Sequence, residues 1–71
     1  MELVYKKSYK TCEPYQVERE LDKIMKEQAE KHGWRFVRRT PMGVVVHPSR
    51  DEMITYRYKQ GEIIEEKFVW M

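Results

Sequence analysis

The sequence predicts an α+β fold with two layers, in which one amphipathic helix packs on a mainly antiparallel sheet in the order β-α-β-β-β-β. Two observations point to this fold. Apolar residues recur at helical spacing only between Pro14 and Gly33, whereas the segments on either side alternate with a period of two. Short turn sequences separate the later segments, which is typical of neighbouring antiparallel strands. With 71 residues, the chain is expected to form a single small domain, residues 1–71, with a thin core.

The first strand and the helix follow from residue type and spacing. Residues 3–11 are rich in strand-favouring leucine, valine and tyrosine. Pro14 suits a first helical turn, and the residues after it at spacings of three and four are Val17, Leu21, Ile24, Met25 and Gln28. Two acid-first pairs on the solvated helix face are Asp22 with Lys26 and Glu27 with Lys31. Gly33 ends the helix because glycine tolerates the left-handed conformation found there.

Two hairpins are expected after the helix. Their strands cover residues 34–39, 43–47, 53–59 and 62–70. The first hairpin turns at Thr40-Pro41-Met42-Gly43, where proline presets one backbone angle and glycine relieves crowding. The second turns at Gln60-Gly61, and residues 47–52 form the loop between the hairpins.

Side-chain alternation assigns each strand residue to a face. We expect the more apolar row of each strand to face the helix, namely Leu3, Tyr5, Tyr9, Trp34, Phe36, Met42, Val44, Val46, Ile54, Tyr56, Tyr58, Ile64, Phe68 and Trp70. Leu21, Ile24 and Trp34 are expected to be buried between the helix and the sheet. The opposite face then carries Glu2, Glu65 and a basic row with interspersed aliphatic residues: Lys6, Lys10, Arg35, Arg39, His47, Arg57, Lys59, Lys67, Val4, Val37, Val45, Ile63 and Val69.

The positive charge is concentrated near the first hairpin. The net charge is only +2, but residues 34–59 hold six basic and two acidic side chains. We therefore predict that the exposed sheet face binds an acidic macromolecule, because basic and apolar groups together can neutralise an anion and exclude water. The predicted binding residues are Lys6, Lys10, Arg35, Arg38, Arg39, Arg57, Lys59 and Lys67. An ordinary solvated sheet face with charges for solubility remains an alternative.

Two functions fit such a face. The preferred one is a small regulatory or adaptor protein, such as a viral or mobile-element product, that binds a protein partner. The alternative is a nucleic-acid-binding module that contacts the phosphate backbone. Base recognition is disfavoured because Trp34, Phe36 and Tyr56 are expected to face inward, where they cannot stack on bases. A homodimer formed through the sheet face or an edge strand is a further option.

Catalytic chemistry is not expected. Cys12 is the single cysteine, and no neighbouring base activates it. His32 and His47 are the only histidines and lack the spacing of a zinc site. Adjacent acids, such as Asp51 and Glu52, point to opposite faces of a strand and cannot act as an acid/base pair. We expect a non-enzymatic protein with no metal or cofactor.

The compartment is inferred from two features. A lone cysteine cannot form an internal disulfide, which favours a reducing environment. The longest apolar run, Val44–Val46, is too short to span a bilayer, and the first ten residues lack an apolar signal core. A cytoplasmic location without membrane association is therefore expected.

Overall fold

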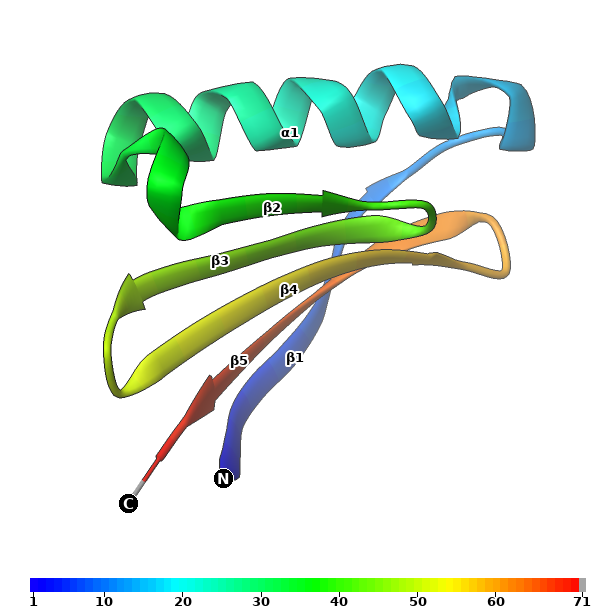
Figure 1. Ribbon diagram of the computed structural model, residues 1–71. Helices are drawn as coiled ribbons and strands as arrows, with labels where there is room; N and C mark the ends of the chain where they lie inside the picture. Colours follow the sequence, from blue (N-terminus) through cyan, green and yellow to red (C-terminus); the bar gives the residue numbers. More distant parts are fainter. Residues whose placement is uncertain (71) are drawn as a thin grey trace.

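The computed structural model describes residues 1–70 and has one helix on one side of a five-stranded antiparallel sheet (Figure 1). The strands are β1 (Glu2–Thr11), β2 (Val37–Thr40), β3 (Gly43–Ser49), β4 (Glu52–Lys59) and β5 (Glu62–Val69). The helix α1 (Val17–His32) lies between two 3₁₀ turns, η1 (Pro14–Gln16) and η2 (Trp34–Phe36). The predicted α+β class and the order β-α-β-β-β-β are confirmed.

Local hydrogen bonds define both ends of the helical segment. The backbone N–H of Glu13 donates to the side-chain oxygen of Gln16 at 3.0 Å, which closes a capping box at the first turn. At the other end Gly33 has a φ of 100°, and its N–H donates to the carbonyl of Ala29 at 2.8 Å. A positive φ favours glycine, so the helix stops where the sequence predicts.

The strands are arranged in the order β1-β5-β4-β3-β2, and every neighbouring pair is antiparallel. The first strand therefore pairs with the last, and the two ends of the chain lie at the same end of the sheet (Figure 1). Register shifts in β1 leave Val4 and Tyr9 as extra residues opposite β5. The strand β3 extends through Pro48 to Ser49, which reduces the predicted loop to a tight turn at Arg50 and Asp51.

Two hairpin turns depend on glycine for different reasons. At Gly43 a Cβ atom would overlap the backbone carbonyl oxygen of Tyr56, so this position needs glycine because β4 approaches closely. Gln60 and Gly61 have φ angles of 48° and 85°. Two successive positive φ angles are the signature of a tight hairpin turn whose twist matches that of the strands.

The core lies between α1 and the middle of the sheet, with the helix packed mainly on β2 and β3 (Figure 1). Its buried members are Val17, Leu21, Ile24, Val44, Val46, Tyr56 and Ile63. Residues directly opposite each other on paired strands share a face, so the register identifies which side of each strand meets the helix. The predicted burial of Leu21 and Ile24 is confirmed.

The predicted burial of Trp34 and Phe36 is wrong. Trp34 is 60% exposed and Phe36 is 47% exposed. These residues form η2 rather than the start of a strand, and β2 begins only at Val37. The chain leaves the helix at Gly33 with a single turn, so period-two alternation does not yet apply to residues 34–36.

The assignment of β5 to faces is also wrong. Ile63 is fully buried in the core, and Glu65 is on the same side of the strand. Ile64 and Phe68 are therefore on the side away from the helix, as is Leu3, which lies opposite Phe68. Both rows of β5 mix apolar and charged residues, so alternation alone could not identify the covered one.

A tyrosine cluster borders the core on the helix side of the sheet. The hydroxyl of Tyr5 donates a hydrogen bond to the carboxylate of Glu65, which is only 8% exposed. The rings of Tyr9 and Tyr56 meet edge to face, with centroids 5.3 Å apart. Burial, followed by the hydrogen bond to Glu65, raises the pKa of Tyr5 to about 12. Burial is also the largest cause of a raised pKa at Tyr56.

Candidate binding surface

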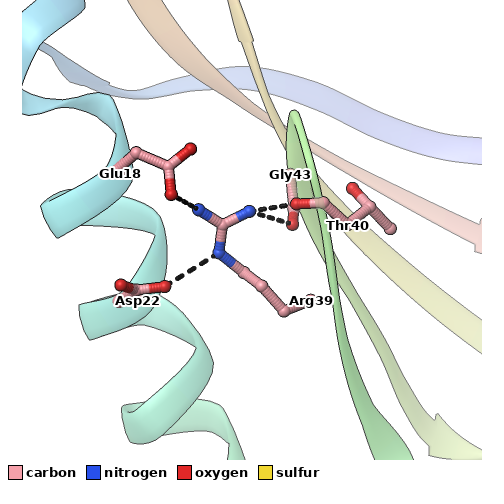
Figure 2. Close-up of polar contacts among 5 residues, drawn as sticks. All are labelled: Glu18, Asp22, Arg39, Thr40 and Gly43. Atoms are coloured by element: carbon pink, nitrogen blue, oxygen red, sulfur yellow. Dashed lines mark hydrogen bonds and ion pairs between the residues drawn. The ribbon is translucent and has the colours of Figure 1, made fainter.

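Arg39 was predicted to lie on the exposed face, but it lies on the helix side and is occupied by structural contacts. Its Nη2 lies 2.9 Å from a carboxylate oxygen of Glu18, and its Nε lies 3.0 Å from one of Asp22 (Figure 2). Its Nη1 donates to the backbone carbonyls of Thr40 and Gly43 (Figure 2). Arg39 therefore holds the first hairpin against α1, and Asp22 pairs with it rather than with the predicted helix neighbour.

Lys10 and Lys67 were also expected on the exposed face and are instead on the helix side, each paired with an acid. The Nζ of Lys10 lies 2.9 Å from a carboxylate oxygen of Glu20 in α1. That hydrogen bond is the main reason that the pKa of Glu20 is lowered. The Nζ of Lys67 lies 2.9 Å from a carboxylate oxygen of Glu52. Lys67 is on the same side of β5 as Glu65. These lysines, like Arg39, contribute to holding the domain together.

The opposite side of the sheet, here named the open face, carries no helix or strand within residues 1–70 (Figure 1). Strand pairing places the following residues on it: Leu3, Lys6, Ser8, Arg38, Thr40, Val45, Met53, Thr55, Arg57, Lys59, Glu62, Ile64, Glu66 and Phe68. Four of these are basic, two are acidic and five are apolar. The open face is therefore both basic and apolar, although only four of the eight predicted binding residues lie on it.

A hollow of about 420 Å³ lies on the open face near the β2–β3 turn, with Thr40, Val45, Thr55 and Phe68 among its lining residues. Arg57 and Glu66 also line it, and the Nε of Arg57 lies 3.0 Å from a carboxylate oxygen of Glu66. The Glu66 side chain is 10% exposed, whereas that of Arg57 is 52% exposed. The guanidinium group thus covers the acid and presents its remaining donors to solvent.

Three basic residues of the open face form no ion pair with any described residue. They are Lys6, Arg38 and Lys59, and all three are exposed. Lys6 lies opposite Glu66 in the sheet, and Lys59 lies opposite Glu62 at the Gln60-Gly61 end. They spread positive charge over the open face from β1 to β2 and to the Gln60-Gly61 end.

Arg35 lies away from the open face, in η2 after the helix. Its guanidinium carbon is 5.8 Å from the centroid of the Phe36 ring. Arg35 and Phe36 line a small hollow of about 150 Å³ together with Val37, Arg38 and His47. Exposed aromatic and basic side chains therefore meet at this corner, although Phe36 was predicted to lie in the core.

Groups with catalytic potential are few among residues 1–70. The thiol of Cys12 is half-buried, and burial followed by Glu20 raises its pKa, which suppresses the nucleophilic thiolate. No group of three or more histidine, cysteine, aspartate or glutamate side chains is arranged to hold a metal ion in this part of the chain. The same residues include no helix with the length and apolar character needed to cross a membrane.

The apolar row of the open face was missed because it was assigned to the helix side. A sequence signal for the correct register does exist: Glu18 and Asp22 stand four residues apart on α1 and repel each other unless a cation lies between them. Pairing them with Arg39 would have turned β2 the right way, with Arg39 and Val37 toward the helix.

Comparison with known proteins gives no relative: no family model, curated protein or solved structure matches this chain.

Proposed function

We propose that this protein is a small non-enzymatic binding protein that docks an acidic partner protein on its open face. The observation that carries the proposal is the combination of an apolar strip with unpaired cations on an uncovered sheet. Leu3, Phe68 and Met53 lie side by side across β1, β5 and β4 at one end of the sheet. Lys6 and Arg38 lie in the next row of the open face, and Lys59 lies at its opposite end. Apolar area beside polar and charged groups is the usual anatomy of a protein interface.

The hollow beside Arg57 gives the face a place for an anchoring side chain. Its lining includes Val45, Phe68 and the Arg57–Glu66 pair, so an apolar group can enter while a neighbouring carboxylate reaches the exposed guanidinium. Buried anchors of this kind account for most of the affinity of an interface. An acidic partner matches the cations of the open face and is attracted to them at long range.

A nucleic acid on the open face is the second candidate, but the face has features that suit it less well. Phe68 is its only aromatic side chain, and that ring is partly covered. Glu62 and Glu66 lie among the cations and repel a phosphate backbone. The apolar strip of Leu3, Met53 and Phe68 would make no favourable contact with phosphate groups.

The test is capture of partners from a lysate with and without nuclease, using a charge-reversed variant. In Lys6→Glu with Lys59→Glu, two exposed and unpaired cations become acids. The matched control is Lys23→Glu with Lys26→Glu on the exposed side of α1. We expect the wild type and the control to capture the same protein after nuclease treatment, and the Lys6/Lys59 variant to lose it.

Two results would contradict the proposal. One is capture that disappears with nuclease, since nucleic acid would then be the ligand. The other is equal capture by all three proteins, since the open face would then play no part. Thermal melts of all three proteins should coincide, because exposed substitutions usually change stability by less than about 0.5 kcal/mol.

A further inference from the structure

The end of the helix forms a second surface, separate from the apolar strip. This surface, here named the helix-end corner, is formed by His32, Arg35, Phe36, Arg38, His47, Pro48, Ser49 and Arg50, and Trp34 begins the turn η2 beside them. Trp34 and Phe36 leave 60% and 47% of their surface in solvent. A thin core would gain from burying such large rings, yet the turn η2 holds both outside it.

Two hollows are lined in part by Phe36. One, of about 150 Å³, is lined by Arg35, Phe36, Val37, Arg38 and His47. The other, of about 380 Å³, is lined by His32, Phe36, His47, Pro48, Ser49 and Arg50. Phe36 and His47 line both, so a flat ligand group that enters either hollow meets the Phe36 side chain. The larger hollow has the volume of a small-ligand site.

The cations of this corner are free of ion pairs with any described residue. Arg35, Arg38 and Arg50 form none within residues 1–70. The carboxylate of Glu52, which begins the next strand, is held by Lys67 at 2.9 Å and by Ser49 at 3.0 Å. Asp51, next to Arg50 in the turn, is the remaining acid beside the corner. With Arg35, Arg38 and Arg50 against Asp51, the corner has an excess of positive charge.

We propose that the helix-end corner binds an unpaired segment of nucleic acid. Proteins that bind single strands stack bases on exposed aromatic rings and place cations along the backbone. Trp34 and Phe36 supply the rings, and Arg35 and Arg50 supply the phosphate contacts. A base in a duplex is already stacked on both faces, so a double strand gains only the charge contacts. An acidic peptide lacks flat rings for Trp34 and Phe36, and binds more weakly for that reason.

The test is fluorescence anisotropy of a dye-labelled oligonucleotide titrated with the full chain. The probes are oligo-uridine, oligo-thymidine, a duplex of equal length and polyglutamate. We expect both single strands to bind more tightly than the duplex and polyglutamate. A preference for uridine or for thymidine supports the proposal equally.

Two variants separate stacking from charge. Trp34→Ala should weaken single-strand binding by about 5-fold to 100-fold, which is the usual effect of losing one stacked base. Arg35→Gln with Arg50→Gln should make the slope of log affinity against log salt less steep by about 1.4, since each lost phosphate contact removes about 0.7 for a single strand. The matched control, Lys23→Gln with Lys26→Gln, should leave both quantities unchanged.

Oligonucleotide binding tests the helix-end corner, and lysate capture tests the open face, so one proposal can be wrong while the other holds. Lys6→Gln with Lys59→Gln changes the open face alone, and it should bind oligonucleotide like the wild type. The inference is overturned if single strands do not bind, if duplex and single strand bind equally, or if Trp34→Ala binds like the wild type with an unchanged melt. None of these results alters the outcome of the lysate capture.

Discussion

At the scale of single residues, Arg39 connects three parts of the structure. It joins two acids of α1 to the backbone of the β2–β3 turn, and only 17% of its side chain is exposed. Arg39→Ala should lower the free energy of unfolding by about 1–3 kcal/mol, because charged hydrogen bonds are lost and the Thr40 carbonyl loses a donor. Urea denaturation measures this loss. Arg38→Ala, on the exposed side of the same strand, is the control and should change stability by less than about 0.5 kcal/mol.

Ionisation of Tyr5 is expected to lower the stability of the fold at alkaline pH. Burial and the hydrogen bond to Glu65 raise its pKa from the ordinary tyrosine value of 10.0 to about 12. A raised pKa means that the neutral tyrosine stabilises the fold below pH 10, and that this contribution is lost as the pH rises through 12. Urea midpoints measured across this range should fall.

The variant Tyr5→Phe isolates this contribution. It should be less stable than the wild type at neutral pH, where the hydrogen bond is intact, and should lose less stability between pH 10 and 12. If the urea midpoints of both proteins fall equally steeply between pH 10 and 12, the loss of stability comes from other groups, such as Tyr56.

At the scale of elements, the helix is attached through one apolar face. Leu21 is fully buried between α1 and the sheet. Leu21→Ala should cost roughly 2–5 kcal/mol, since it removes buried methyl groups and leaves a cavity. A thermal melt reports the loss, and Lys23→Ala on the solvated side of α1 should melt like the wild type. An unchanged melt for Leu21→Ala would mean that another helix face carries the packing.

The β2–β3 hairpin depends on the close approach at Gly43. An alanine Cβ there would meet the carbonyl oxygen of Tyr56, which belongs to the backbone of β4 and cannot rotate away. Gly43→Ala should therefore destabilise the fold by about 1–3 kcal/mol, as overpacking usually does. Gly61→Ala is a useful contrast because no atom lies within 4 Å of its added methyl group, so any loss there reports the positive φ alone.

Elements set by neighbouring residues were predictable from the sequence, and those set by distant contacts were not. The helix and the hairpin turns depend on local signals, such as Gly33 and the pair Gln60-Gly61. The face of β5 depends on which part of the sheet α1 covers, and that in turn depends on the Arg39 contacts with Glu18 and Asp22. No spacing within β5 carries this information.

The positions of the residues in the two candidate surfaces were likewise predicted only in part. Arg57 and Lys59 were correctly placed on the exposed sheet face because their strand alternates cleanly beside buried Tyr56. The helix-end corner was missed because Trp34 and Phe36 resemble core residues by type. Only the 3₁₀ geometry of η2 shows that these rings are outside.

At the scale of the whole molecule, one thin core links α1 and the two hairpins, and β1 is joined to it through its pairing with β5. Unfolding in urea should therefore be a single transition with a slope of about 1 kcal/mol per molar, the low end for small proteins. Circular dichroism of the helix and amide NMR signals of β1 should report the same midpoint. Separate midpoints would mean that β1 detaches before the rest.

The extra residues in β1 have a consequence for the behaviour of the chain at high concentration. This strand is ten residues long and lies at the border of the sheet, where its outer backbone groups could template growth of a fibril. Val4 and Tyr9 interrupt its regular pleat, and Lys6, Lys7 and Lys10 repel a second copy laid alongside. A sheet border that is both kinked and charged disfavours the addition of a further strand, so we expect β1 not to seed cross-β stacking when the folded protein is concentrated.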